Sequence, residues 1–436
     1  MLKKLLLPGV LILAACAGGN FEKSNAQFVT GFSDGTFEKS ADAIAAATIS
    51  NQKPNNPYLG GLQCGSGYMW AEISEGRKVC FDAVNMVLMG EADEGTSYKI
   101  KNYETIMFKT YEGAGLLADG DPSARQAFLQ AYDLQSQNIQ EMGAEIEELR
   151  EKFAEDQQKL RDAGQDVPDM NSIVAAVDAE MASAPDSVAP MKDYANPYTT
   201  YLIALYDGAN GDMNNAKNFL KRVAQFAPEN TFVKTDADAL ASKKGSVWII
   251  LENGMVGPVK KRALAPQLLQ SLNIRVTIPD MFPGTPAVRS VSAAAGDQRV
   301  ETEFLANMDA IVKTDLDKYK SGNIVKSVAF EVGKVAAATI AGIAAKKAAD
   351  KSPWADLAAM AAVMAIMSVE KPWDLRSWDS LPNEIQTARL DMPADRKVII
   401  GNDLEVMIPD DIKNAIVFVR IPTVKSNIGI MVGKLN

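Results

Sequence analysis

The segment WDLRSWDSLP holds the most suggestive group of side chains in this sequence. Trp373 and Trp378 lie close in sequence to Asp374, Arg376 and Asp379. Sugar rings stack on indole faces, and carboxylates and guanidinium groups bond to hydroxyls, so one interpretation is a contact surface for a glycan or a partner. The other is structural, with Arg376 paired to an aspartate and the tryptophans closing a junction between a helix and a sheet. Prolines on both sides of the segment favour such a connector.

The sequence contains no histidine, and this excludes several kinds of active site. Histidine is the only side chain that titrates near neutral pH without perturbation, and it is the commonest ligand of transition metals. Ser-His-Asp and Cys-His relays and the usual histidine-bearing zinc sites are therefore ruled out. Aspartate and glutamate number 55 together, so acidic pairs arise by chance on almost any helix face. We assign no catalytic residue, no metal site and no cofactor.

Cys64 and Cys80 are candidates for a disulfide, because an exported chain usually pairs its cysteines in an oxidising compartment. The spacing argues against the bond if a helical hairpin turns at residues 74–76. Cys64 would then lie eleven residues before the turn and Cys80 five after it. The resulting axial mismatch of about 9 Å exceeds the reach of a disulfide. A turn placed a few residues away would change this result, so the bonded and the free forms both stay open.

The first sixteen residues resemble the leader of a bacterial lipoprotein. Lys3 and Lys4 precede an apolar run that is too short for a permanent membrane span, and Leu-Ala-Ala-Cys ends it at Cys16. The resemblance to a lipobox implies that a signal peptide, residues 1–15, is removed and that Cys16 receives acyl chains, palmitate among them. Ala17 after the cysteine implies sorting to the outer membrane, on the periplasmic side. The alternative is an ordinary secretory signal with an unrelated cysteine.

The acyl chains of Cys16 would be the protein's hold on the membrane, because three chains exceed the two signals that stable anchoring needs. Deleting the acylated cysteine is then expected to release a soluble protein. The formal net charge is −10, so nucleic acid is repelled overall, and no basic cluster compensates. We expect the partners to be the membrane, through Cys16, and another envelope protein, but no nucleic acid.

Composition divides the rest of the chain into three parts. Residues 16–36 are rich in glycine, serine and asparagine and predict a flexible tether. Residues 37–242 show helical periodicity, and residues 243–436 combine strands with helices. The predicted fold class is α+β, with an N-terminal helical-repeat domain followed by an α+β domain that has a mostly antiparallel sheet.

The clearest helical unit is residues 196–228, in which two helices flank a Gly-Asp turn. The turn glycine, Ala216, Leu220 and the terminal proline fall at the spacings of a tetratricopeptide repeat, which the unit resembles. Residues 102–132 form a weaker copy, and a third hairpin is expected around Gly76. Because such hairpins cannot bury their apolar faces singly, we expect them to stack into a solenoid. A generic helical bundle is the alternative.

A polar stretch between the repeats predicts a long helix over about residues 123–162. Its length would be about 60 Å, more than a hairpin partner could cover, so its outer half should project. Apolar residues recur along it in steps of three and four and form a narrow seam. The seam is either packed on a neighbouring helix or free for docking or dimer formation.

In the C-terminal part, strands are predicted at 247–252 and 273–279, and five more follow between residues 385 and 433. We expect the first two strands to join the final ones in one sheet. A helix is predicted over about residues 301–319, where apolar side chains recur on one face.

Two alanine-rich runs, residues 335–345 and 357–367, look at first like membrane spans. Each is about 16 Å long as a helix, against a hydrocarbon core of about 30 Å, and charged residues stand between them. We therefore expect an antiparallel helical hairpin that is packed tightly in the core under the β-sheet. A membrane-associated pore subunit is a third functional possibility, which rests only on these runs.

The segments LENGMVGPVKK and KPWDLRSWDSLPNEIQTARLDMP, with the repeat and the lipobox, resemble a family of bacterial lipoproteins with tetratricopeptide-like repeats. The resemblance covers residues 57–425 and implies fold and location, but no catalytic residues. The predicted function is a lipid-anchored periplasmic scaffold that binds another envelope protein through the concave face of its helical repeats. The alternative is an enzyme that acts with two carboxylates on a glycan such as peptidoglycan.

Overall fold

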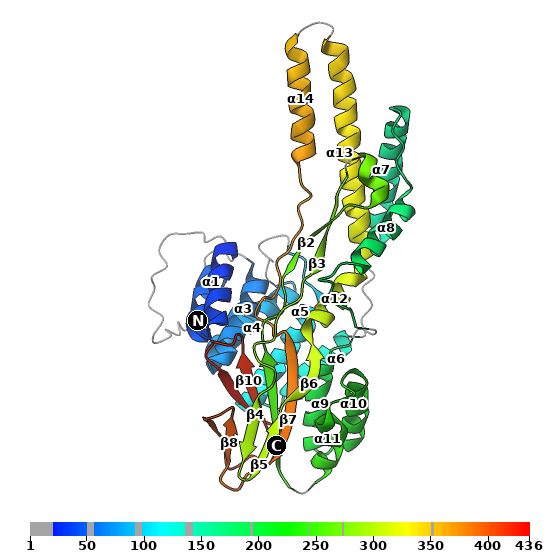
Figure 1. Ribbon diagram of the computed structural model, residues 1–436. Helices are drawn as coiled ribbons and strands as arrows, with labels where there is room; N and C mark the ends of the chain where they lie inside the picture. Colours follow the sequence, from blue (N-terminus) through cyan, green and yellow to red (C-terminus); the bar gives the residue numbers. More distant parts are fainter. Residues whose placement is uncertain are drawn as a thin grey trace.

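The computed structural model describes most of the chain beyond the leader (Figure 1). The described residues are 21–49, 56–91, 98–135, 143–191, 195–242, 244–272, 274–349 and 353–436. Cys16 and the signal peptide lie outside them, so the acylation stays a prediction.

The N-terminal region is all-helical over the described residues up to 242, and its helices are paired (Figure 1). The predicted helical hairpins are confirmed as the pairs α3–α4, α5–α6 and α9–α10, and α1–α2 forms a further pair. The bounds are α1 Phe21–Ser33, α2 Phe37–Thr48, α3 Pro57–Trp70, α4 Ser74–Leu88, α5 Asn102–Asp119, α6 Ala124–Leu134, α7 Gly143–Asp162, α8 Met170–Ala182, α9 Pro197–Ala209, α10 Met213–Phe226 and α11 Thr231–Ala241.

The prediction of a flexible tether through residue 36 is wrong from Phe21 onward, where α1 begins. Phe21, Phe28 and Phe32 recur at spacings of seven and four, lie on one face of α1 and are buried. The helix packs mainly against α2. The glycine- and serine-rich composition obscured this apolar face, because three aromatic side chains bury enough surface to outweigh weak helix propensity.

Local sequence signals explain where the paired helices begin. Helices α3 and α9 both follow an asparagine and start with Pro-Tyr. Asn56 accepts a hydrogen bond from the Leu59 amide, and Asn196 accepts from the amides of the two residues after its proline. An asparagine cap satisfies amides that lack a helical partner, and proline at the first position gives up no helical hydrogen bond.

The single helix predicted over about residues 123–162 is wrong, because two helices lie within these bounds: α6 ends at Leu134 and α7 begins at Gly143. Residues 136–142 lie outside the described chain. The apolar seam of α7 does not form a free docking surface, since Phe153 and Leu160 are buried in a cluster with α8 and α13. The structure therefore bears out the packed alternative over the described part of the seam.

The C-terminal region is α+β, with mixed and antiparallel sheets. A five-stranded sheet has the order β11-β10-β1-β7-β6, in which β1 and β10 run parallel and the other neighbours are antiparallel. The remaining strands form a β2–β3 pair and a four-stranded sheet of order β5-β4-β8-β9. The strand bounds are β1 Ser246–Asn253, β2 Val259–Leu264, β3 Val276–Met281, β4 Ser292–Ala295, β5 Gln298–Glu301, β6 Glu303–Asn307, β7 Glu384–Asp391, β8 Lys397–Ile400, β9 Leu404–Met407, β10 Ala415–Ile421 and β11 Gly429–Lys434.

Two predictions about this region need correction. The strand predicted at 247–252 joins final strands as expected, but the one predicted at 273–279 pairs with β2 in a separate sheet. The helix predicted from residue 301 begins at Met308, as α12 Met308–Lys318. Its expected first turns are β6, because Glu303–Asn307 adds an edge strand to β7. Apolar residues at helical spacing are also compatible with a strand. The pairing with β7 makes residues 303–307 a strand rather than the start of the helix.

The five-stranded sheet is buried on both faces, which makes the molecule layered. One face carries Trp248, Ile250 and Phe418 into a core shared with α3, α5 and α9. The other face carries Ile249 and Val417 into a core shared with the four-stranded sheet. Burial on two faces accounts for the continuous apolar runs of β1 and β10, which do not alternate as a half-exposed strand would.

The alanine-rich hairpin is present as α13 Lys320–Ala349 and α14 Pro353–Ser368, but it is not packed under the sheet. Figure 1 shows the two helices extending away from the body side by side. The inner part of α13 packs against α7, α8 and β3, in a cluster that includes Ile324 and Val328. Beyond it, residues 337–349 and 353–369 form what we call the arm. The prediction of a tightly packed core is wrong for most of the arm's described side chains, residues 337–344 and 360–369, because many of them are exposed.

Candidate functional site

The tryptophan-rich connector joins the arm to β7, and its two tryptophans lie in different environments. Trp378 is fully buried, its indole Nε1 donates to Ser66 Oγ at 3.0 Å, and its ring meets Tyr111 edge-on. Trp373 is only half-buried, and its Nε1 lies 3.4 Å from Thr277 Oγ1. A glycan platform across both indoles is therefore wrong, because Trp378 has no surface to offer.

The charged residues of the connector are engaged with one another and with the helical region. Arg376 donates from Nε and a terminal nitrogen to the two carboxylate oxygens of Asp374, at 2.8 and 2.7 Å, as the structural interpretation predicted. Burial disfavours ionisation of Asp374, but the hydrogen bonds and charge of Arg376 outweigh it and lower the pKa of this carboxyl. Arg376 also lies over the ring of Tyr98, 5.1 Å from its centroid.

Asp379 links the connector to α1 and α3. Its carboxylate accepts from Asn25 Nδ2 and from Ser377 Oγ, each at 2.9 Å, and Asn25 Oδ1 accepts from Gln63 Nε2 at 3.0 Å. Burial raises the pKa of Asp379, and the two hydrogen bonds oppose this effect. Residues predicted to be a tether thus belong to the junction between the helices and the connector.

A fully buried glutamate lies at the centre of the same junction. Glu104 on α5 accepts from the Trp378 amide at 3.2 Å and from Tyr98 OH at 2.6 Å, and Lys101 Nζ lies 3.6 Å away. Asp315 on α12 is also buried, and desolvation raises its pKa to about 6 despite the charge of a neighbouring lysine. The junction therefore holds a carboxyl that stays protonated to a higher pH than an ordinary aspartate.

A second buried carboxylate connects the helices to the sheet. Glu252 on β1 accepts from Tyr111 OH on α5 and from Tyr198 OH on α9, the latter at 2.8 Å. Arg420 on β10 donates to backbone carbonyls, among them those of Glu252 and Ser380. Burial raises the pKa of Glu252, and the charge of Arg420 opposes this. All four side chains are fully buried, so no substrate reaches this carboxylate from solvent, and the cluster is structural.

A third buried carboxylate, Asp236 on α11, accepts hydrogen bonds from side chains on α9, β1 and β7. It accepts from Tyr201 OH at 2.6 Å, from Trp248 Nε1 at 3.0 Å and from the guanidinium of Arg389. Burial raises its pKa, and the Arg389 charge and these hydrogen bonds oppose the rise. No local sequence pattern marks these clusters, because each joins side chains from three or more separate elements.

The sheet covers the inner face of the helical pairs. The first helix of the pairs, α3, α5 and α9, is buried along most of its length. Helices α3 and α5 contact β11, and α9 contacts β6, within one continuous core. A partner cannot occupy a face that the chain's own sheet already fills, so this part of the predicted binding face is closed.

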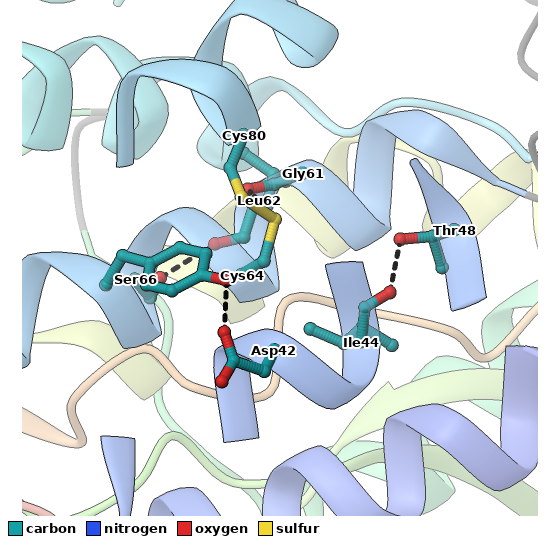
Figure 2. The surroundings of a disulfide bond; sticks show 9 residues. Asp42, Ile44, Thr48, Gly61, Leu62, Cys64, Ser66 and Cys80 are labelled. Carbon is teal, nitrogen blue, oxygen red and sulfur yellow. Dashed lines mark hydrogen bonds between the residues drawn. A yellow bond between two sulfur atoms is a disulfide. The ribbon is translucent and has the colours of Figure 1, made fainter. Parts of the chain in front are cut away.

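Cys64 and Cys80 form a disulfide between α3 and α4 (Figure 2), with their Cα atoms 6.0 Å apart. The helices are connected through Glu72, which has a positive φ of 57°. Each cysteine is eight residues from Glu72, so the two lie at the same height in the hairpin. The predicted axial mismatch does not arise, because the hairpin turns about three residues earlier than residues 74–76. Gly65 helps the close approach, since a Cβ there would lie 2.1 Å from the Phe81 ring.

Two surfaces stand out for exposed apolar side chains. The first is the outer side of α4 with its C-terminal cap residue, where Val79, Met86 and the cap residue Met89 are exposed. The second is the arm, whose members include Ile340, Ile343, Met360, Met364 and Val369. Periodicity identified both helices, but it could not show which apolar positions lack a neighbour. Among the described residues, no group of three or more histidine, cysteine, aspartate or glutamate side chains could hold a metal ion.

Comparison of the chain with protein-family models, curated protein sequences and solved structures found no match. The resemblance to lipoproteins with tetratricopeptide-like repeats therefore stays a prediction.

Proposed function

We propose that this protein is a lipid-anchored scaffold of the bacterial cell envelope, which binds a partner protein through the outer side of its helical pairs. The anchor is the acylated Cys16 implied by the lipobox. The observation that carries the proposal is the exposed apolar row on α4. Val79, Met86 and Met89 are 51%, 44% and 64% exposed. Methionine is common on surfaces that bind helices, because its side chain is flexible and polarisable.

The α4 surface is rigid, as a docking surface for a folded partner needs to be. The disulfide fixes α4 to α3, and Arg77 on α4 forms a 2.7 Å ion pair with Asp119 at the end of α5. Burial lowers the pKa of Arg77, and Asp119 opposes this effect. A preorganised surface loses little conformational entropy on binding, which favours affinity. The predicted interaction through the repeats is thus retained, but on their outer side rather than on the face that the sheet covers.

The proposal is tested with a photo-crosslinking amino acid at Met86 in the acylated full chain, within intact envelopes. We expect a discrete protein adduct, identified by mass spectrometry. The matched control carries the same probe at Asn218, an exposed polar position on α10. Introducing Val79→Asp and Met89→Asp beside the probe should abolish the adduct. Equal adducts from both probe positions, or an adduct that survives the two aspartates, would contradict binding at this surface.

A further inference from the structure

The arm exposes apolar side chains on two sides. On α13, residues 337, 340, 343 and 344 are exposed. On α14, residues 360–362, 364, 365 and 368 are exposed, as is Val369 directly after it. Met360 and Met364 are 62% and 63% exposed. Soluble proteins rarely leave a continuous apolar surface of this kind in water. Something other than water therefore covers the arm.

The distribution of exposed residues on α14 indicates an apolar medium rather than a single partner groove. At 100° per residue, the exposed positions between Met360 and Val369 cover roughly 200° of the helix circumference. From Leu357 to Val369, serine is the only polar residue. A helix that docks on a protein shows an apolar stripe about 100° wide, with polar residues opposite, and a helix that is apolar all round is surrounded by protein core or lipid.

We propose that the arm inserts into a lipid bilayer, as a second membrane contact independent of Cys16. One described helix is long and apolar enough to cross a membrane, α13 over Lys320–Ala344. Its inner part cannot do so, because Val328 and Val332 are buried in the cluster with α7 and α8. The inserted part is therefore the arm, from residue 337 outward on α13 and up to residue 369 on α14.

The base of the arm has the side chains that membrane proteins place at the lipid headgroups. Lys334 and Lys371 lie over the Phe330 ring, 5.4 and 5.5 Å from its centroid, and Lys371 is 5.0 Å from the Trp373 ring. Lys334 Nζ also donates to the carbonyl of Val369, at 2.8 Å, where the apolar run of α14 ends. Lys334 Nζ also pairs with Glu331 at 2.8 Å, and both side chains are only 12% exposed, so this lysine holds the base of the arm together. Aromatic rings such as that of Trp373 favour the membrane interface. We expect insertion to stop at these residues at the base of the arm.

The arm is too short to cross a bilayer fully. Its apolar runs, residues 337–345 and 357–367, are about 14 and 16 Å long as helices. The apolar band of bacterial outer-membrane proteins is about 25 Å tall. We therefore expect the arm to enter the bilayer without crossing it.

A second copy of the chain covers the arm less well. Two helices about 10 Å wide and 20 Å long give roughly 400 Å² on one side of the arm, so a symmetric dimer would bury about 800 Å² in total. This is the size of a packing contact, and it would leave the other side of the arm in water. A bilayer covers both sides at once.

Flotation with liposomes tests the proposal. The cores described above lie within residues 21–436, so the chain is used without residues 1–20, which removes both the acyl chains and the signal peptide. We expect this chain to float with vesicles of phosphatidylethanolamine and phosphatidylglycerol. The variant Met360→Asp/Met364→Asp should lose partitioning by more than about 100-fold, since an aspartate within a membrane helix strongly disfavours insertion.

The matched control is Val79→Asp/Met86→Asp, which places the same charges on exposed apolar residues of α4. It should float like the unaltered chain, and because it disrupts only the proposed partner surface, the two proposals fail separately. If the arm variant unfolds at the same temperature as the unaltered chain, the variant is folded. The proposal is overturned if the unaltered chain stays with the soluble fraction, or if the arm variant floats equally well. An oligomer that forms without lipid, is lost in the arm variant and does not float would assign the arm to a second copy.

Discussion

Trp378 is the residue on which the connection between the helical region and the sheet most depends. It contacts Tyr111 on α5 and bonds to Ser66 on α3, while its amide donates to Glu104. Trp373, five residues earlier, is half-exposed and makes one long hydrogen bond. The same residue type in one segment therefore has two different roles.

Replacing Trp378 with alanine is expected to lower the free energy of unfolding by about 3 to 5 kcal/mol, because a large buried side chain leaves a cavity and unpaired polar groups. Urea unfolding followed by circular dichroism measures this change. Trp373→Ala is the control and should cost less than about 1 kcal/mol. Equal losses in both variants would contradict the structural role of Trp378.

Asp315 should make stability depend on pH between about 4 and 6. Its pKa is about 6 in the folded chain and 3.8 for the free side chain, so the folded state binds a proton more tightly. The free energy of unfolding therefore falls as the pH rises through this window, by at most about 3 kcal/mol. Asp315→Asn should match the unaltered chain near pH 4 and exceed its stability at pH 7.5.

Urea titrations at pH 4, 6 and 7.5 measure this difference. Asp403→Asn is a suitable control, because Asp403 is exposed in the turn between β8 and β9. If Asp315→Asn changes the stability equally at all three pH values, the carboxyl does not titrate in this window.

At the scale of elements, three features hold the α3–α4 pair: the disulfide, the glycines of α3 that let α4 approach closely, and the burial of α3. The disulfide joins residues with a sequence separation of 16. Replacing both cysteines with alanine is expected to lower the free energy of unfolding by about 3 kcal/mol, because the unfolded chain regains the entropy that the loop removed. Chemical unfolding with and without reductant measures it. The unaltered chain under reductant should approach the variant, and a variant as stable as the oxidised chain would contradict the prediction.

At the scale of the whole molecule, the helical region and the sheet form one core rather than two. The cluster that contains Tyr58 and Tyr201 from the helices also contains Trp248 and Phe418 from the strands. A boundary at residue 243 separates two kinds of secondary structure, but it does not separate two hydrophobic cores.

A fragment of residues 21–242 is therefore expected to be unstable, because it would expose the faces of α3, α5 and α9 that the sheet covers. The fragment should bind the dye ANS and melt without a sharp transition, whereas residues 21–436 should show one main transition. Calorimetry and dye fluorescence measure both properties. A fragment that unfolds cooperatively would show that the helical region is an independent domain.

Much of the local structure was predictable from the sequence. The helical pairs follow from 3.6-residue periodicity and from caps such as Asn196 before Pro197, and β1 and β10 follow from apolar runs. These signals are local, because a helix or strand needs only its own residues to show which face is apolar. The lack of histidine, and the chemistry this excludes, is likewise a property of the sequence alone.

Only the tertiary structure decided what each apolar surface contacts. Trp378 is buried because Ser66 and Tyr111, more than 260 residues away in sequence, meet it at the junction. The runs of α13 and α14 have no polar face, so their pattern suits a core helix and an exposed one equally. Burial depends on neighbours that the fold brings together. Periodicity therefore gave the arm its secondary structure, and the three-dimensional arrangement left it exposed.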